Sequence, residues 1–326
     1  MKRTTCLFIL FALLSTYLIG QSFNAEHLYP IENSHSFVQF EVTYMGYAKF
    51  KGNFSDFYGS IYYNPAAPER TSVTFQVDVE SIDTNNDWRD RDLKSGNWFL
   101  AERFPHIHFS STSVRSSGEG LIVTGDLSIK ETTKRIEFEL PAPVSVVDMR
   151  GDNQIIFTGE YTLNRKEYGV MGKNWSQVKE GIVALSDEVT IEFSLLGKQI
   201  NEGNFSNFLR NPKSPPGAVY AAYKEGGLNA AIGKYESLKA DTSFTMNSRT
   251  LNMVGYMLAK QGKLAEAQTI FERNLSDFPE DGNVYDSLGE LYARKGELEK
   301  ATAHYRKSLA LDPKNMNAAE VLKQLD

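Results

Sequence analysis

Apolar and polar residues alternate along most of the segment between residues 36 and 196. Near its start, Val38, Phe40 and Val42 alternate with Gln39 and Glu41, and later segments repeat the pattern. A period of two is typical of strands that bury one face. We count about eight such segments in succession, separated by turn residues, which predicts an all-β antiparallel barrel or sandwich.

Residues 83–97 interrupt this alternation. They are rich in Asn, Asp, Arg and Lys, so we expect a helical turn that crosses one end of the sheet. A barrel of about eight strands encloses just enough room for its own side chains or for one slender ligand. A segment over its end would act as a lid.

The last third of the chain repeats itself every 34 residues, which is the spacing between Val254 and Leu288. This period is typical of tetratricopeptide repeats, whose helical hairpins stack on one another to share a core. A weaker copy lies at about residues 220–240, and residues 316–325 have the pattern of a capping helix. The other matched pairs are Gly255 and Gly289, Ala267 and Ala301, Phe271 and Tyr305, and Pro279 and Pro313. The sequence predicts an all-α array after the β domain.

A proline-rich stretch at residues 211–217 separates the two patterns. Proline lacks an amide donor and fixes its own φ angle, so this stretch favours a linker over a strand or helix. The predicted division is a signal peptide at 1–20, a β-barrel domain at 21–200, a linker at 201–217 and a repeat domain at 218–326.

The N-terminus has the features of an export signal. Lys2 and Arg3 precede an apolar stretch at residues 7–19, and Gly20 is a small residue at a suitable cleavage point. About thirteen apolar residues are too few to span a bilayer, although a membrane anchor is the alternative interpretation. We expect a periplasmic or secreted protein with no integral membrane segment in the mature chain.

Composition narrows the classes of partner. A formal net charge of -6 provides no cluster of cations for nucleic acid, which is therefore not expected as a partner. The only cysteine, Cys6, lies inside the predicted signal, so the mature chain would have no disulfide or thiolate site. Gln21 and Ser22 stand where a lipoprotein would carry its lipid-modified cysteine.

Ten short motifs between about residues 26 and 198 resemble the YceI-like family of polyisoprenoid-binding proteins. Each motif alone is weak, but their order and spacing together are specific. The motifs are SHSFVQF at 34–40, FKGNF at 50–54, FYG at 57–59, VESIDT at 79–84, RD at 89–90, LKS at 93–95, WF at 98–99, FPHIHF at 104–109, TGDLSIK at 124–130 and YGV at 168–170.

The resemblance implies an eight-stranded, lipocalin-like antiparallel barrel whose apolar interior holds an isoprenoid or a similar amphiphile. It also implies export across the inner membrane. The chain departs from the family at Thr43 and Tyr44, where a basic residue and a histidine are common before Met-Gly. The resemblance therefore implies no head-group preference at this position.

Candidate ligand-binding residues fall into two sets. The first set is apolar and is expected to line a tunnel, although a solid core filled by the same side chains is the alternative. Its members are Phe40, Val42, Phe50, Phe54, Val77, Ile82, Phe109, Leu127 and Phe157. The second set, Asp83, Arg89 and Asp90, lies in the lid, where the guanidinium would form an ion pair or bind an anionic head group. Trp88 and Trp98 are expected to hold the lid on the barrel rim.

Other chemistry finds little support in the sequence. His106 and His108 share one face of a predicted strand, a spacing compatible with metal binding, but no third ligand is evident. There is no nucleophile elbow, phosphate loop or zinc-protease motif. We therefore expect neither an enzyme nor a cofactor, apart from an isoprenoid or quinone held as ligand.

Two functional hypotheses remain from different classes. In the first, the barrel carries a long apolar lipid and the repeats bind a partner protein or mediate self-association. In the second, the repeats form a scaffold for other proteins and the barrel is only structural.

Overall fold

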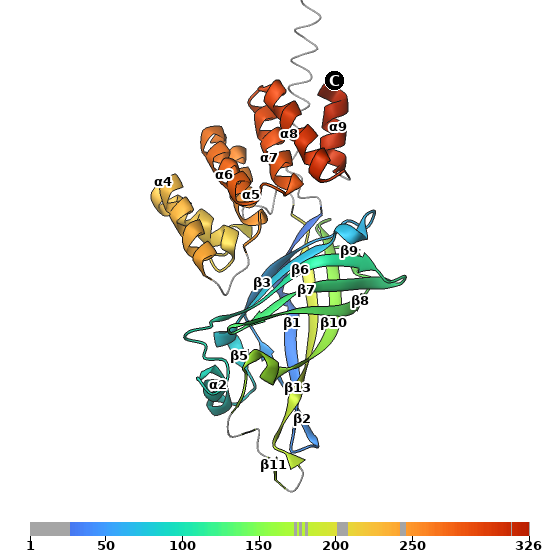
Figure 1. Cartoon of the computed structure of the whole chain (residues 1–326), viewed down its shortest axis with the longest axis vertical. Coiled ribbons are helices and arrows are strands. Elements are labelled where there is room, and N and C mark those ends of the chain that lie inside the picture. Colours follow the sequence, from blue (N-terminus) through green and yellow to red (C-terminus); the bar gives the residue numbers. More distant parts are fainter. Residues whose placement is uncertain are drawn as a thin grey trace, which may run out of the picture. The chain divides into compact units, whose positions relative to one another are not determined.

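The computed structural model describes residues 27–172, 175, 178–179, 182–200, 208–241, 246–313 and 315–325. The predicted signal peptide and residues 201–207 of the predicted linker lie outside the described residues. Contacts divide the chain into two compact units, one reaching Ile200 and one made of the helices that follow. Figure 1 shows both units, which are described separately below.

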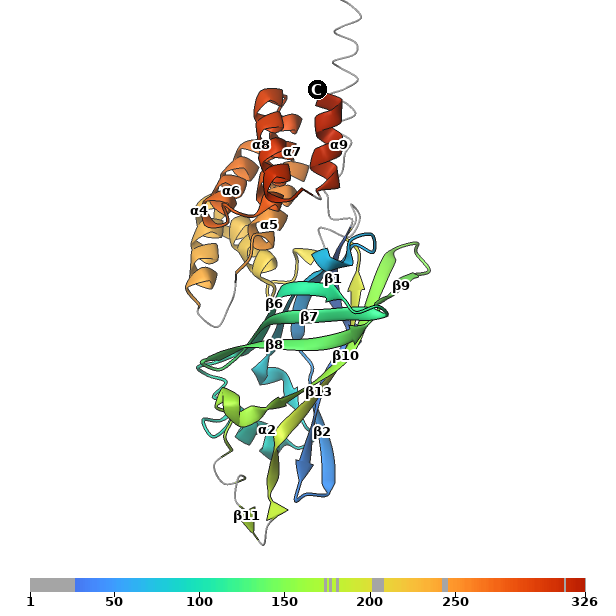
Figure 2. The same cartoon turned by 45° about the vertical axis from the view of Figure 1, so that its right-hand side comes forward.

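The first unit is built on one antiparallel sheet that curls into a half-barrel (Figure 2). Its order is β8-β7-β6-β4-β3-β1-β13-β10-β9, and β2 pairs with both β1 and β5. The strands are β1 (Leu28–Tyr44), β2 (Ala48–Phe54), β3 (Phe57–Tyr62), β4 (Ser72–Asp78), β5 (Ile82–Asp83), β6 (His106–Ser116), β7 (Gly120–Ile129), β8 (Thr132–Pro141), β9 (Val144–Val147), β10 (Asn153–Asn164) and β13 (Leu185–Lys198).

The antiparallel fold is confirmed, but the predicted count of eight strands is wrong. The described sheet has eleven strands. One reason is that β1 is 17 residues long and pairs with β3 near its start and with β2 near its end. The very short β5 and the fully exposed β9 add two more. A separate hairpin joins β11 (Val178–Lys179) to β12 (Ile182–Val183).

Alternation in the sequence becomes alternation of burial in the sheet. Along β7, buried residues such as Leu121 and Val123 alternate with half-buried ones. Where β1 meets β2, Phe40 lies opposite Gly52. A Cβ atom on this glycine would lie 2.3 Å from Cζ of Phe40. Glycine therefore gives the phenyl ring its place against the neighbouring strand.

The lid is the helix α2 (Asp87–Lys94) and the turns that follow it. Asn86 caps the helix, because its side chain accepts a hydrogen bond from the Arg89 amide. Behind the helix, Nε1 of Trp98 donates to Asp92 over 2.9 Å. Nζ of Lys130 donates to the carbonyl oxygens of Trp98 and Gly169 at 2.8 and 2.7 Å, which ties the lid to the sheet.

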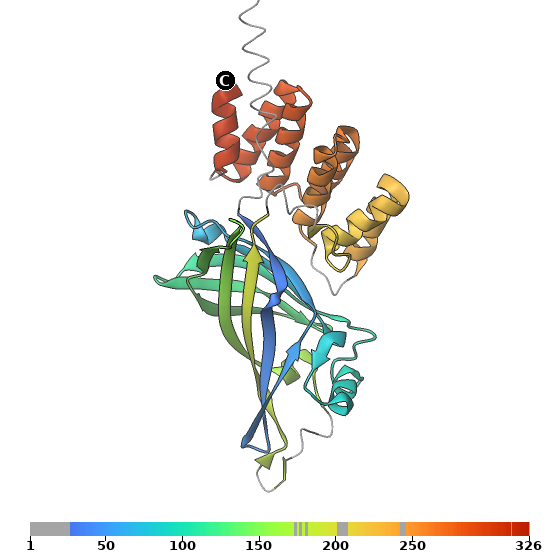
Figure 3. The same ribbon diagram turned by 180° about the vertical axis from the view of Figure 1, so that it is seen from behind.

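The described part of this unit also has three short 3-10 helices, and two of them border strands of the sheet. They are η1 (Pro68–Arg70), η2 (Val79–Ser81) and η3 (Arg165–Tyr168). The last of these follows β10 directly and ends at Gly169, whose φ of 71° is left-handed. Figure 3 shows the same unit from behind, with α2 and the turn between β1 and β2 toward one end of the sheet.

The second unit consists of helices with the predicted hairpin repeat. They are α4 (Pro215–Ala240), α5 (Arg249–Lys260), α6 (Leu264–Asp277), α7 (Gly282–Arg294), α8 (Leu298–Leu311) and α9 (Met316–Leu325). Gly255 on α5 faces the ring of Phe271, and Gly289 on α7 faces the ring of Tyr305. These small residues allow the paired helices to approach closely, and the predicted all-α array is confirmed.

Helix α4 begins inside the segment predicted as a linker. Ser214 caps α4, with its hydroxyl accepting a hydrogen bond from the Gly217 amide, and Pro215 occupies the first turn. Proline is well suited to that position because its missing N–H would have no helical partner there. The proline-rich stretch therefore contains the start of a helix.

Candidate functional site

The curled sheet encloses a small apolar cavity of about 150 Å³. Side chains from most strands of the sheet line it, because each strand directs every second residue inward. The lining residues are Val38, Phe54, Ile61, Val73, Phe75, Val77, Ile107, His108, Phe109, Val123, Leu127, Ile129, Ile136, Phe138, Leu140, Phe157, Tyr161, Leu163, Ile191, Phe193 and Leu195.

A second cavity of about 350 Å³ lies between the sheet and the lid. It contains most of the polar groups of the site. Its lining residues are Phe40, Val42, Tyr44, Phe50, Phe54, Asn86, Trp88, Arg89, Asp92, Leu93, Trp98, Phe99, Ile107, Ile129, Leu163, Arg165, Val170, Trp175, Leu185, Val189 and Ile191.

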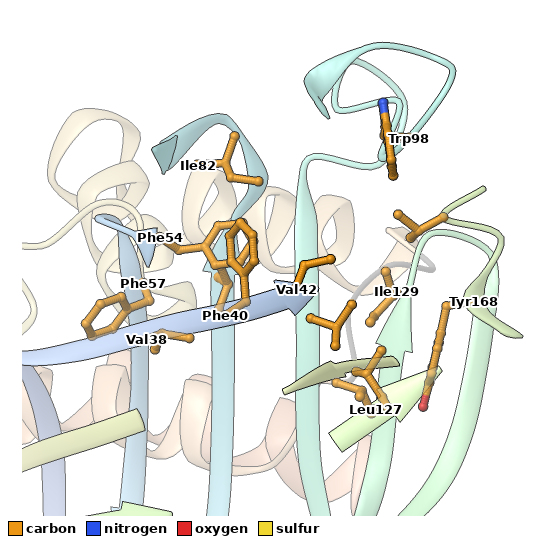
Figure 4. Packing of buried hydrophobic residues seen from close by; sticks show 14 of the residues in the cluster. Val38, Phe40, Val42, Phe54, Phe57, Ile82, Trp98, Leu127, Ile129 and Tyr168 are labelled. Carbon is orange, nitrogen blue, oxygen red and sulfur yellow. The ribbon is translucent and has the colours of Figure 1, made fainter. Parts of the chain in front are cut away.

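The two cavities adjoin, because five side chains line both of them. These are Phe54, Ile107, Ile129, Leu163 and Ile191. Figure 4 shows part of this packing, with Phe40 and Phe54 side by side; their ring centroids are 5.6 Å apart. The enclosed space therefore consists of an inner apolar chamber and a wider outer chamber under the lid.

Arg89 places a cation at the outer chamber without a carboxylate partner among the described residues. Its Nε and Nη2 atoms donate to Oγ1 and the carbonyl oxygen of Thr84, each over 2.7 Å. The guanidinium lies over the ring of Phe50, 4.7 Å from its centroid. Asp90 instead accepts hydrogen bonds from the amide and hydroxyl of Thr84. Of the two roles expected for this guanidinium, the ion pair is not formed among the described residues, and binding of an anionic head group stays a prediction.

Arg165 is a second arginine at the outer chamber, and it is almost fully buried. It donates to the carbonyl oxygens of Ser186, Val170 and Met171 over 2.9, 2.8 and 2.6 Å. Burial lowers the pKa of its guanidinium, and the Asp187 carboxylate offsets part of this effect because a nearby negative charge raises the pKa. Arg165 therefore holds together the chain segments around the chamber.

Nine of the twelve candidate binding residues line the cavities. Phe40, Val42, Phe50 and Arg89 line the outer chamber, and Phe54 lines both. The remaining four, Val77, Phe109, Leu127 and Phe157, line the inner chamber. Most of the apolar candidates also pack in the hydrophobic core, so the same side chains form the core and border the cavities.

Three candidates lie outside both cavities. Ile82 is buried in the core beside the lid. Asp83 is exposed, and its carboxylate accepts a hydrogen bond from the Asn85 amide. Asp90 is used by Thr84, as described above. Each of these side chains packs in the core or accepts a hydrogen bond from a nearby backbone amide. The spacing of the sequence motifs does not predict these contacts.

The two tryptophans of the lid differ. Trp98 is 4% exposed and holds the lid as expected, whereas Trp88 is 62% exposed and does not. Arg165 and Trp175 also line the outer chamber, and neither is among the residues predicted for the site. An isolated arginine after a strand looks the same in sequence whether it is buried or solvated, so only the fold identifies its role.

The histidine pair carries no metal site in the part of the chain that the structure describes. The rings of His106 and His108 are 5.8 Å apart and nearly perpendicular. Within the described ranges, no group of three His, Cys, Asp or Glu residues is placed to hold a metal ion. His108 contributes to the wall of the inner chamber.

Comparison with known proteins identifies the sheet unit. A model of the YceI-like domain matches residues 29–196, and Protein YceI of Salmonella arizonae is 31% identical over 170 residues, which cover 52% of this chain and 88% of that protein. The chain belongs to the YceI-like family. The resemblance found in the sequence motifs is thereby confirmed.

Two solved structures match part of this chain. Burkholderia cenocepacia BcnA has 22% identity and a TM-score of 0.45, covering 51% of this chain and 98% of that chain. A polyisoprenoid binding domain from Saccharophagus degradans has 13% identity and a TM-score of 0.40, covering 53% and 98%.

The helical unit matches a second family model. A tetratricopeptide repeat model covers residues 247–314, which confirms the repeats read from the 34-residue period. This YceI-like chain therefore combines a curled-sheet domain with tetratricopeptide repeats. Among the described residues, no helix is long and apolar enough to cross a membrane.

Proposed function

We propose that this chain is an exported binding protein that holds one polyisoprenoid-like or other long apolar lipid, such as a quinone, in the two chambers of its sheet. The observation that carries the proposal is the pair of adjoining cavities, one of about 150 Å³ inside the sheet and one of about 350 Å³ between the sheet and the lid. Their combined space lies within the range of about 300–1,000 Å³ that is common for ligand pockets.

The chemistry of the two chambers suits an amphiphile. The inner wall is almost entirely aliphatic and aromatic. Burial of an apolar chain against it would favour binding by about 25 cal/mol for each Å² of apolar surface removed from water. The outer chamber adds Arg89 and Asn86, whose donors fit a carbonyl, hydroxyl or phosphate oxygen. The tail would lie inside and the polar end under the lid.

The repeat domain supplies the second part of the proposal. Stacked tetratricopeptide hairpins form a surface on which a peptide segment or another protein can lie. We propose that residues 218–326 recruit a partner protein or a second copy, while residues 21–200 carry the lipid. The signal at residues 1–20 would bring the chain to the periplasm or the outside, and no step of this function requires catalysis.

Native mass spectrometry and solvent extraction of gently purified protein test the proposal. We expect one apolar lipid per chain, and uptake of a labelled isoprenoid after the lipid is removed. An empty chain that takes up no labelled isoprenoid would contradict it. If the repeat domain then still captured a partner, the scaffold hypothesis would be the better account.

A further inference from the structure

Five large apolar side chains are exposed around the outer chamber, in three separate segments of the sheet unit. Tyr44, Met45 and Tyr47 lie at the turn between β1 and β2, and their exposed fractions are 37%, 43% and 85%. Trp88 lies on the lid helix and Met171 lies after η3, with exposed fractions of 62% and 44%. We call these five residues the apolar rim.

Contacts bring these segments together at the chamber. Tyr44 and Trp88 both line it while remaining exposed, so the chamber reaches the surface within the rim. The ring of Tyr44 lies 6.1 Å from that of Trp175, which also lines the chamber. The carbonyl of Met171 accepts a bond from Arg165. The three segments of the rim therefore meet at the outer chamber, and the rim is not a scatter of single exposed residues.

The chemistry of the rim matches the surface of a bilayer. Tyr and Trp have an apolar body and a polar end, which suits the boundary between head groups and acyl chains. The lid helix carries three acidic residues, Asp87, Asp90 and Asp92, and three basic ones, Arg89, Arg91 and Lys94. Balanced charges fit zwitterionic head groups, and the net charge of -6 gives no general attraction to an anionic surface.

We propose that the apolar rim docks on a zwitterionic phospholipid bilayer, so that an apolar ligand passes between the bilayer and the outer chamber without crossing water. This inference rests on the proposed lipid-carrying function and adds the surface through which the cavity is loaded. The side chains insert at the interface, and the net-neutral lid stays among the head groups.

Vesicle flotation of the full chain tests the docking. The rim variant is Met45→Asn with Tyr47→Ser, because neither residue lines a cavity and asparagine tolerates the left-handed backbone at position 45, where φ is 52°. The matched control is Val147→Ser with Met149→Ser, two exposed apolar residues at β9 and the turn that follows it.

We expect the wild-type chain and the control to float with vesicles of phosphatidylcholine and phosphatidylethanolamine. The rim variant should partition about tenfold less, because two apolar side chains no longer leave water. Raising the salt or adding phosphatidylglycerol should change little. Equal flotation of rim variant and wild type, no flotation at all, or a requirement for anionic lipid would overturn the proposal. So would a rim variant that loses self-association instead of vesicle binding.

A second measurement separates this inference from the proposed function. A fluorescent farnesyl probe dispersed in water reaches the cavity without a bilayer, so the rim variant should bind it as the wild type does. Val77→Phe, which fills the inner chamber, should lose the probe and still float. A chain that floats but binds no probe refutes the carrier function alone, and one that binds the probe but does not float refutes the docking alone.

Discussion

Gly52 lies opposite Phe40 on the neighbouring strand, and the phenyl ring occupies the space where a Cβ atom would be. That atom would lie 2.3 Å from Cζ of Phe40 and 2.8 Å from Cγ2 of Thr84. Both neighbours border or support the outer chamber, since Thr84 holds Arg89. The absence of a Cβ atom at Gly52 thus allows the Phe40 ring to occupy its position in the cavity wall.

Replacing this glycine should destabilise the sheet. Gly52→Ala forces the ring of Phe40 out of its place, and overpacking of this kind costs about 1–3 kcal/mol. Urea unfolding measures the change. Gly233→Ala on the exposed face of α4, where a Cβ would meet nothing within 4 Å, is the control. It should stabilise the chain by about 1 kcal/mol or less, and an equal effect of both substitutions would contradict the packing described.

At the residue scale, the sequence predicts which side chains face the cavity better than it predicts their hydrogen bonds. Strand alternation was sufficient to place Val77, Phe109 and Leu127 on the cavity wall, because the side-chain period of a strand is two. It was not sufficient for Asp83 and Asp90, whose carboxylates bind nearby backbone amides. Nor did it reveal Arg165, whose burial depends on segments distant in sequence.

At the level of elements, Lys130 is one of the residues that hold the lid to the sheet. Nζ of Lys130 donates to carbonyl oxygens on two segments, those of Trp98 and Gly169. Burial lowers the pKa of this ammonium, yet its two acceptors keep it in place. The lid and the turn after η3 are thereby joined at the end of β7.

Lys130→Met should loosen the lid, because it leaves two partly buried carbonyl groups without their donor. We expect a loss of about 1–3 kcal/mol in unfolding free energy and faster hydrogen exchange at residues 95–101. Lys51→Met, which removes an exposed ion pair with Glu192, is the matched control and should cost less than about 1 kcal/mol. Unchanged exchange in the lid would show that Lys130 does not hold it.

A buried carboxyl group should make the helical unit sensitive to pH. Asp286 on α7 accepts hydrogen bonds from Asn315 and Asn317. Burial, together with the nearby Glu290 carboxylate, raises the pKa of Asp286 to about 7. A folded-state pKa above the unfolded value means that the unfolded chain loses its proton first, so stability falls as pH rises toward 7 and just beyond.

We therefore expect the helices to gain about 1 kcal/mol of stability as pH falls from about 8 to about 6. Thermal unfolding of the full chain, followed by circular dichroism near 222 nm, measures this gain. Asp286→Asn should flatten the dependence even if it lowers the melting temperature, and Glu299→Gln at an exposed position should not. A melting temperature that rises with pH would contradict the assignment.

The elements themselves were only partly predictable. The helical repeats follow from the 34-residue period, because that period records one structural unit. The strand count does not follow from alternation, since β5 has two residues and β9 is exposed along its whole length. The start of α4 at Pro215 was also missed, because a proline that ends one element can begin the next.

The whole molecule joins a cavity-bearing YceI-like domain to tetratricopeptide repeats in one chain. In the proposed function, the first unit would store an apolar molecule in chambers that no single strand could form. The second unit would contact another protein. This division is the basis of the proposed function. The proposed lipid binding depends on the cavities of the first unit.

Titration of the delipidated full chain with a labelled isoprenoid, compared between wild type and Val77→Phe, tests this central claim most directly. Val77 is 4% exposed and lines the inner chamber, so the larger ring should fill the chamber and lower affinity about tenfold or more without unfolding the sheet. Val144→Phe, at an exposed position on β9, should bind as the wild type does. The account is contradicted if Val77→Phe folds and binds the isoprenoid with unchanged affinity, or if the wild type does not bind it.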